Sequence, residues 1–568
     1  MLHDPDLISL QEVRTKVDKA WAAAQRFRTF SQEQVDAVVE RMAEAARGHA
    51  ERLAQMAVEE TGYGNARDKL AKNMLAAETL PHQLRGMKTV GVLRERPDEK
   101  VTEFAVPVGV VAAILPTTNP TSTAIYKALI ALKAGNAIVF SPHPRAKGCT
   151  CATAEVLYRA AVSAGAPEGI LQCLTQPTMD STNELMRHPR TAVILSTGGA
   201  GIVKAAYSSG KPAYGVGPGN VPILLDTTAD VHSAIRGILA GKTFDNGTLC
   251  SSEQTIVAET QIRQNVLAAL AANGAFLCDQ SQAAALAKVL FTRGTVVNPE
   301  LVGHAAVEIA QAAGFQVPPH TRVLAAEILG IGKDHPLSAE KLSPVLAVHF
   351  VETFDAALNA CEAVLRFHGL GHTCGIYTTD DAKARLYAQR MPAHRILANT
   401  PTPHGSVGIT TALFPAMTLG CGSVAGNATG DNITPLHLLN IKRLAWAIRP
   451  WANSEVTPIA APSAAPVSKA RIAAAVDRYL GGAPAKPANV AALVDKFLAT
   501  KGTAPTTPAP KPPAPPPVAI TDFVCEDDVR QAIRNNLKIY IGPKSIVTPS
   551  ARELANAQRD EILILAQR

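Results

Sequence analysis

The pattern of hydrophobic and polar residues changes several times along the chain. Residues 10–90 are rich in Ala, Glu, Arg and Gln, and their apolar positions follow helical spacing, as at Val35, Val38, Val39 and Met42. This spacing predicts two or three amphipathic helices, one of which ends at a glycine within 59–64. We interpret these helices as packing elements.

From residue 101 short apolar runs alternate with helical patterns. An apolar run at 106–115 precedes a helical pattern at 121–134 and another apolar run at 137–140. Strand, helix and strand in this order predict a parallel sheet. The alternation continues with helices at 151–164, 181–187 and 202–208 and with strands at 170–174, 192–195 and 221–225. The sequence therefore predicts an α/β protein.

The same alternation returns beyond residue 250. Helical patterns at 261–272, 281–290 and 299–313 are separated by short apolar runs, and strands are predicted at 376–378 and 395–398. These elements indicate a second α/β domain. The segment 432–446 is predicted to complete the compact part of the chain.

The composition then changes sharply. Residues 454–518 are rich in Pro, Ala and Thr, which predicts a flexible linker. Two amphipathic helices are predicted inside it, at 468–481 and 489–500, and we interpret them as docking peptides. The alternative is that they fold back on the main body. Residues 519–568 predict a small α/β segment whose role the sequence does not assign.

Charge and cysteine content narrow the class of protein. The 568 residues carry a formal net charge of +7, without a dense basic run or interleaved aromatic residues, so nucleic acid binding has little support. The nine cysteines are scattered and lack metal-ligand spacing, which favours a reducing compartment and argues against a metal site. No signal peptide and no apolar run of about 18 residues is present, so we expect a cytoplasmic protein without membrane contact.

The segment 243–254 contains the candidate nucleophile, Cys250. Asp245, Asn246 and Gly247 favour a tight turn before it, and the residues 251–253 have the composition of a helix start. A thiol at the positive end of a helix dipole has a lowered pKa and is a better nucleophile. The alternative is that Cys250 is a small buried apolar residue, as most cysteines are.

Two glycine clusters could approach a nucleotide. The first, 196–201, follows a predicted strand and precedes a helix, and the second is 215–220. Small residues let the backbone come close to a cofactor, and a helix N-terminus attracts phosphate. Neither cluster is a true GxGxxG. No acidic residue lies between Ser208 and Asp226.

The assembled motifs resemble the CoA-acylating branch of the aldehyde dehydrogenase superfamily over residues 10–450. The matching segments are Thr197-Gly198-Gly199, VKAAYSSGKP at 203–212, GVGPGNVP at 215–222, FDNGTLCSSEQ at 244–254, EKLSPV at 340–345 and TLGCG at 418–422. The resemblance implies a Rossmann-type cofactor domain at 1–240, completed by about 425–450, and a catalytic domain at 241–424. It also implies strands used in dimer assembly, and hence a homodimer or homotetramer.

The resemblance also implies roles for individual residues. Cys250 would attack the aldehyde, while the side-chain amide of Asn119 and the backbone N–H of Cys250 hold the oxyanion. His372 would assist CoA or be structural. The implied cofactor is NAD, with CoA as co-substrate, and the residues expected at the cofactor site are Ser141, His143, Thr197, Gly198, Gly199, Gly217 and Glu340. Because the stretch between Ser208 and Asp226 has no carboxylate to activate water, we expect the CoA thiol to take the acyl group.

The tail resembles extensions of enzymes housed in bacterial microcompartments, which bind shell or cargo proteins. That setting implies a short-chain aldehyde such as propionaldehyde or acetaldehyde as substrate, and a location inside a cytoplasmic microcompartment. Two alternatives stay open: a hydrolytic aldehyde dehydrogenase that forms a free acid, and an assembly protein that works through its tail.

Overall fold

The computed structural model describes residues 4–449, 521–535, 537–556 and 563–565. These residues belong to two compact units, Met1–Pro450 and Trp451–Arg568. The two amphipathic helices predicted at 468–481 and 489–500 lie outside the described residues. Within the described part of the chain, no helix combines the length and the apolar composition that a membrane crossing needs.

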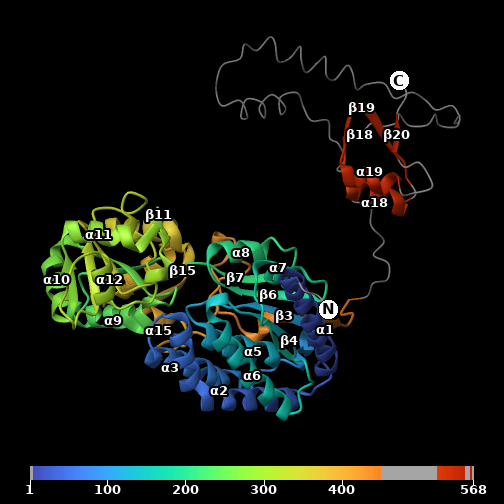
Figure 1. Cartoon of the computed structure of the whole chain (residues 1–568), viewed down its shortest axis with the longest axis horizontal. Coiled ribbons are helices and arrows are strands. Elements are labelled where there is room, and N and C mark those ends of the chain that lie inside the picture. Colours follow the sequence, from blue (N-terminus) through green and yellow to red (C-terminus); the bar gives the residue numbers. More distant parts are fainter. Residues whose placement is uncertain (1–3, 450–520, 536, 557–562, 566–568) are drawn as a thin grey trace, which may run out of the picture. The chain divides into compact units, whose positions relative to one another are not determined.

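A five-stranded parallel sheet forms the first half of the larger unit (Figure 1). Its strand order is β5-β4-β3-β6-β7, with β3 Val110–Ile114, β4 Ala137–Ser141, β5 Leu171–Cys173, β6 Thr191–Thr197 and β7 Ala213–Val216. The helices between these strands are α5 Pro120–Lys133, α6 Lys147–Ser163, α7 Met179–Arg187 and α8 Ala200–Tyr207. The predicted strand–helix alternation is confirmed in this region.

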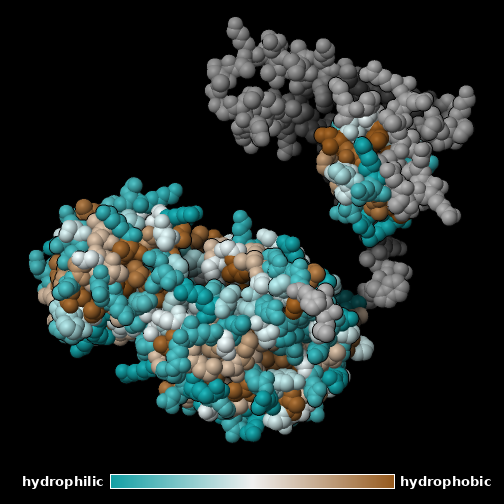
Figure 2. All heavy atoms as spheres, in the orientation of Figure 1, coloured by the Kyte–Doolittle hydropathy of each residue, from teal (hydrophilic) through white to brown (hydrophobic). Residues whose placement is uncertain are grey.

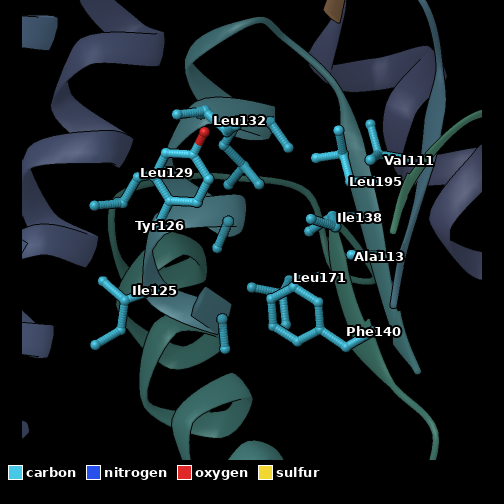
Figure 3. Close-up of a cluster of buried hydrophobic side chains, with 14 of the residues drawn as sticks. Val111, Ala113, Ile125, Tyr126, Leu129, Leu132, Ile138, Phe140, Leu171 and Leu195 are labelled. Carbon is cyan, nitrogen blue, oxygen red and sulfur yellow. The ribbon is translucent and has the colours of Figure 1, made fainter. Parts of the chain in front are cut away.

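Helix α5 is the centre of this half, because all of its residues are buried. Figure 3 shows Tyr126 and Leu129 of the helix in one buried cluster with Ile138 of β4 and Leu195 of β6. Burial on every side explains why apolar residues occur all around the helix between 124 and 132, interrupted by the buried Lys127, rather than along one stripe. The helix thereby fixes the loop before it, which contains Asn119.

The N-terminal residues form α1 Pro5–Phe27, α2 Gln32–Thr61, α3 Ala66–Met74, the π-helix η1 Leu75–Thr79 and α4 Leu80–Leu84. Helix α2 begins with a capping box, in which Ser31 accepts a hydrogen bond from Gln34 N and donates its own N–H to the Gln34 side chain. It ends at Gly62, whose φ of 71° is left-handed, so the predicted glycine stop is confirmed.

A seven-stranded parallel sheet forms the second half, in the order β10-β13-β14-β9-β8-β15-β16. Its strands are β8 Val221–Leu225, β9 Glu253–Glu259, β10 Ala275–Cys278, β13 Val323–Glu327, β14 Val345–Val351, β15 Gly371–Tyr377 and β16 Ala393–Ala398. Its helices are α9 Val231–Thr243, α10 Arg263–Ala272, α11 Gln280–Leu290, α12 Ala306–Ala312, α13 Phe354–Val364 and α14 Asp381–Arg390. Since β8 belongs to this sheet, the chain passes from the first sheet to the second between β7 and β8, earlier than the predicted boundary at 240.

A third, antiparallel sheet pairs the last strand of the unit with two strands from residues 91–107. It consists of β1 Gly91–Arg96, β2 Val101–Pro107 and β17 Leu439–Ala445. The single apolar strand expected at 106–115 is therefore divided: β2 ends at Pro107, Gly109 turns with a φ of 127°, and β3 begins in a different sheet. The remaining short elements are η2 Pro97–Glu99, η3 Pro144–Ala146, η4 Phe244–Gly247, η5 Thr260–Ile262, β11 Phe291–Arg293, β12 Val296–Val297, η6 Pro299–Leu301, η7 Pro336–Ser338, η8 Leu365–Gly369, α15 Thr402–Ser406, η9 Ser423–Ala425 and η10 Pro435–Leu438.

The smaller unit is a parallel three-stranded sheet with two helices. Its elements are β18 Thr521–Val524, α18 Glu526–Asn535, β19 Ile539–Val547, α19 Pro549–Asn556 and β20 Leu563–Leu565. A small core that includes Val524, Val529 and Ala551 packs the helices on the sheet. Phe523 and Ile546 remain mostly exposed, and Figure 2 shows hydrophobic side chains among hydrophilic ones on this unit. The small α/β segment predicted from the sequence is confirmed.

Candidate active site

Cys250 lies between a short 3-10 helix and a strand. Helix η4 ends at Gly247, and β9 begins at Glu253. The helix predicted from residues 251–253 is therefore wrong. Thr255, Ile256 and Val257 of β9 are β-branched, and all of β9 is buried between β8 and β14, so sheet packing decides the local structure.

The thiol of Cys250 is not activated by a helix dipole. Burial, followed by the charges of Glu340 and Cys421, raises the pKa of Cys250 to about 12. The prediction of a lowered pKa is thus also wrong, because the helix on which it depended does not form. A thiol with this pKa is protonated at neutral pH and needs a base in order to attack a carbonyl.

His372 is placed to be that base. It lies on β15, is fully buried, and its Nε2 is 3.2 Å from Sγ of Cys250. Its Nδ1 is 2.9 Å from Oγ1 of Thr373, which also accepts a hydrogen bond from Nε of Arg395 at 3.3 Å. Burial and the charge of Arg395 hold the pKa of His372 well below its usual value. The imidazole is therefore neutral at pH 7 and can accept the thiol proton on Nε2 when Thr373 accepts a hydrogen bond from Nδ1–H.

This pairing predicts how the rate depends on pH. Because His372 is neutral from well below pH 6.5 upward and Cys250 stays protonated up to about 12, kcat/KM should vary little between about pH 6.5 and 9. In His372→Ala the reaction would depend on free thiolate. We expect a loss of about 100-fold at pH 7 and a rise of about tenfold per pH unit. Initial rates measured across this pH range test the pairing, and a flat profile in the variant would contradict it.

Asn119 is held in one orientation by a lysine. It precedes α5, is 9% exposed, and its Nδ2 donates to Oγ1 of Thr118 at 3.0 Å. Its Oδ1 accepts a hydrogen bond from Nζ of Lys72, which comes from α3. Since an ammonium group only donates, this contact assigns the amide oxygen to Lys72 and leaves an N–H of Nδ2 for an oxyanion.

Lys72 also binds Asp245, in the loop that leads to Cys250. The buried carboxylate of Asp245 forms ion pairs with Lys72 and Lys69 and accepts hydrogen bonds from Asn65 N at 2.8 Å and Thr248 Oγ1 at 2.7 Å. Burial alone would raise the pKa of Asp245, but Lys72 and Lys69 hold it below its usual value. One buried carboxylate thus connects the loop of Cys250 with the lysine that orients Asn119.

The backbone around Asp245 is shaped for this contact. Asp245 and Asn246 have φ values of 49° and 52°, a left-handed turn that Asp and Asn tolerate better than other side chains. A Cβ on Gly64 would lie 1.9 Å from Oδ1 of Asp245, so only glycine fits there. The predicted tight turn before Cys250 is confirmed, and its geometry serves the carboxylate.

A cavity of about 760 Å³ opens beside the thiol, at the carboxyl ends of β3, β4 and β6. The predicted site residues that line it are Asn119, Ser141, His143, Thr197, Gly198, Gly199, Gly217, Cys250 and Glu340. His372 is not among the lining residues, since it approaches Cys250 from within the protein. The structure therefore brings all of the predicted cofactor residues into one cavity with Cys250, and this location follows the rule for α/β sheets.

The polar lining of this cavity is held by hydrogen bonds. Oγ of Ser141 lies 2.8 Å from Oγ1 of Thr182, and Nδ1 of His143 accepts from Arg145 N at 3.1 Å. Oε1 of Glu340 accepts from Gly219 N at 3.1 Å. Burial raises the pKa of Glu340 to about 8, so this carboxyl is mostly protonated at pH 7.

The cavity suits a dinucleotide. A Cβ at Gly199 or Gly217 would meet no atom within 4 Å, so the backbone there borders open space. Gly199 precedes α8 without a side-chain cap, which leaves the first N–H groups of the helix to a ligand. These residues fit a pyrophosphate.

The comparisons with known proteins agree with this geometry. The aldehyde dehydrogenase family model matches residues 4–283. The acetylating succinate-semialdehyde dehydrogenase of Clostridium kluyveri is 36% identical over 439 residues, which cover 77% of this chain and 96% of that enzyme. The chain belongs to the aldehyde dehydrogenase family. The chain also matches the bifunctional aldehyde-alcohol dehydrogenase of Escherichia coli, with 42% identity over 442 residues. It spans about half the length of that relative.

The chain is also similar to solved structures of aldehyde dehydrogenases. An acetylating aldehyde dehydrogenase from Geobacillus thermoglucosidasius is 47% identical, with a TM-score of 0.78, and the match covers 80% of this chain and all of that one. A propionaldehyde dehydrogenase from Rhodopseudomonas palustris, solved with bound CoA and an acylated cysteine, is 28% identical with a TM-score of 0.69 and covers 76% of this chain and 97% of that one. Acylating enzymes thus appear in both comparisons, and the predicted resemblance to the acylating branch is confirmed.

Sequence reasoning missed several residues of the site. Lys69 and Lys72 lie on α3, in the region that we interpreted as packing helices, and Arg395 was assigned only to a strand. The sequence signal for the lysines was their spacing of three residues, which places both on one face of α3. That face is buried, and lysines are seldom buried without a partner. Nothing in the sequence marks Arg395, because its contacts with Thr373 and Gly420 O depend on the fold.

Proposed function

We propose that the protein oxidises a short-chain aldehyde to its acyl-CoA with NAD, through a thioester on Cys250. The observation that carries this proposal is the 3.2 Å contact between Cys250 and His372 beside the cavity that contains Asn119. The names of the relatives support the reaction class, because they include acetylating enzymes and propionaldehyde dehydrogenases.

The first step is nucleophilic addition. Sγ of Cys250 attacks the aldehyde carbonyl as its proton passes to Nε2 of His372, which gives a thiohemiacetal. The developing oxyanion accepts hydrogen bonds from Nδ2 of Asn119 and from the backbone N–H of Cys250. Lys72 keeps the amide of Asn119 from rotating, so the donor is in place before charge develops.

Oxidation and acyl transfer follow. The nicotinamide cofactor, when bound, accepts the hydride that leaves the thiohemiacetal carbon, and the acyl group stays on Cys250 as a thioester. The CoA thiol then displaces Cys250, and the net reaction converts aldehyde, NAD⁺ and CoA into acyl-CoA, NADH and a proton.

The residues around Cys250 support CoA rather than water as acceptor. Among the residues that line the cavity, Glu340 is the one carboxylate, and it is mostly protonated at pH 7 because burial raises its pKa to about 8. The cavity residues from 208–226 are Val216, Gly217 and Pro218, none of which can act as a base. A hydrolytic dehydrogenase is therefore the weaker alternative.

The choice of NAD rests on the resemblance. At the carboxyl end of β4, where doubly wound folds place an acidic residue for the ribose, the lining residues are Ser141, Pro142, His143, Pro144 and Arg145. None of them is acidic, so the ribose would be held through other groups. Glu340 is proposed as the contact of the nicotinamide ribose, as the family pattern implies.

Trapping the acyl-enzyme tests the reaction class. Protein mixed with propionaldehyde and NAD, without CoA, should gain one propionyl group on the peptide that contains Cys250, measured by mass spectrometry. Addition of CoA should remove it within one turnover and release propionyl-CoA. An unmodified Cys250 together with NADH formation would exclude the covalent route.

We also propose that the protein works inside a bacterial microcompartment, as a homodimer or homotetramer. The tail supports the first part through its predicted amphipathic helices at 468–481 and 489–500, and a structural neighbour is a propionaldehyde dehydrogenase from the fucose utilisation microcompartment of Clostridium phytofermentans. Exposed apolar residues on β17, Ile441 and Leu444, support assembly through that strand. A tail-driven assembly protein without catalysis is the alternative.

Deletion of residues 454–568 separates catalysis from targeting. We expect kcat to change by less than about twofold, since the site lies wholly within Met1–Pro450, while co-purification with shell proteins is lost. Matched deletions of 468–481 and of 489–500 show which helix docks. A truncated enzyme that lost most of its turnover would contradict this division of labour.

A further inference from the structure

Two cysteines meet at the edge of the first sheet, away from the cavity of Cys250. Cys151 lies on α6 and Cys173 ends β5, the edge strand, and their Sγ atoms are 3.3 Å apart. Both side chains are partly exposed and both are free thiols. A disulfide requires the sulfur atoms to approach to about 2 Å, so a shift of roughly 1 Å would join them.

The thiol pair opens into a cavity of its own. This cavity has a volume of about 570 Å³ and lies between α1, α6 and β5. It is lined by both cysteines and by Lys16, Lys19 and Arg26 of α1, and it shares no lining residue with the cavity of Cys250. A small molecule can therefore reach the thiols without entering the catalytic site.

We propose that Cys151 and Cys173 form a reversible dithiol–disulfide site that reacts with low-molecular-weight disulfides. The thiolate of Cys151 attacks one sulfur of the small disulfide, forms a mixed disulfide and releases one thiolate. Cys173 then attacks Sγ of Cys151, forms the Cys151–Cys173 bond and expels the second thiol. Two cysteine thiols are oxidised, and one small disulfide is reduced to two thiols.

The charges around the pair assign the order of attack. The hydrogen bond from Cys173 lowers the pKa of Cys151 against the effect of burial, and Lys16 and Lys147 lower it further against Glu12. The same contact and burial raise the pKa of Cys173. In residues 4–449, Cys151 is the one cysteine whose pKa lies below the usual value. Cys151 is therefore the attacking thiol and Cys173 the resolving thiol.

Oxidation would join α6 to β5 without touching the catalytic residues. Cys151 and Cys173 are 22 positions apart, so the bond would close a loop that constrains the unfolded chain. We expect the melting temperature of the oxidised form to rise by a few degrees. Aldehyde oxidation should be unchanged, provided that Cys250 is kept reduced by bound substrate during the treatment.

The test uses the full chain in buffers of oxidised and reduced glutathione, quenched with N-ethylmaleimide and analysed by peptide mass spectrometry. We expect a Cys151–Cys173 disulfide in the wild type, a glutathione adduct on Cys151 in Cys173→Ser, and neither product in Cys151→Ser. Cys278→Ser is the matched control, since Cys278 is also partly exposed but its pKa is raised to about 12.

The wild-type measurement decides the proposal even if a variant fails to fold. Alkylation of both Cys151 and Cys173 in the most oxidising buffer would overturn it. A glutathione adduct on Cys173 in Cys151→Ser, with none on Cys151 in Cys173→Ser, would overturn the assigned order. Because none of these readouts depends on aldehyde turnover, failure here leaves the proposed function untouched.

Discussion

Cys250→Ala should abolish aldehyde oxidation, with a fall in kcat of at least about 10⁴-fold both with and without CoA. Without Sγ no thiohemiacetal forms, and an aldehyde bound beside Asn119 has no route to hydride transfer. The cavity loses only one sulfur atom, so cofactor binding should stay within about twofold of the wild type. NADH formation and the dissociation constant for NAD, measured by calorimetry, separate these two effects.

Cys361→Ala is the matched control for this loss. Cys361 is a fully buried thiol on α13, in a core cluster with Leu358 and Tyr387, and it does not line the cavity. The control should lose stability but keep its turnover. Residual activity of Cys250→Ala above about one per cent of wild type would mean that another group forms the covalent bond.

Lys72→Met should slow turnover by about 100-fold, the effect expected when an oxyanion donor is misplaced. The substitution removes the donor to Oδ1 of Asn119, so the amide is free to rotate and to present its oxygen to the developing negative charge. It also leaves Asp245 with one ion pair instead of two, and loss of this charged hydrogen bond should cost about 1.5–3 kcal/mol of stability. The KM for aldehyde should change little, because the contact matters only as charge develops.

Lys69→Met separates the effect on turnover from the effect on stability. Lys69 also forms a buried ion pair with Asp245, but its other hydrogen bond goes to Thr118 O rather than to Asn119. Both variants should unfold at a similar, lowered denaturant concentration, while Lys69→Met loses much less turnover. Equal losses of kcat in the two variants would mean that Lys72 acts through stability alone.

The architecture was largely predictable, because short apolar runs that predict strands alternate along the chain with stretches whose apolar residues follow helical spacing. Buried parallel strands such as β3 and β4 are short and apolar, and the helices that follow them, α5 and α6, are each ended by a glycine with positive φ, Gly135 and Gly165. The prediction was wrong where local signals competed with packing. Residues 251–253 have the composition of a helix start, but the β-branched residues at 255–257 belong to β9 of the seven-stranded sheet.

The candidate site was predictable only in part. Cys250, Asn119 and the glycine turns belong to contiguous motifs, and the fold gathers them into one cavity. The contacts that tune them come from distant segments: His372 lies 122 positions from Cys250, and Lys72 lies 47 from Asn119. The raised pKa of the Cys250 thiol follows from burial, and burial of one side chain is not visible in its local sequence.

NADH formation by purified protein with propionaldehyde and NAD, with and without CoA at pH 7, tests the central claim most directly. The account predicts many turnovers only with CoA, propionyl-CoA as the product by mass spectrometry, and at most one NADH per subunit without CoA. Water is the disfavoured acceptor in this account because Glu340, the one carboxylate among the lining residues of the cavity, has a pKa of about 8 and is mostly protonated at that pH. Equal turnover to free propionate without CoA would contradict the account.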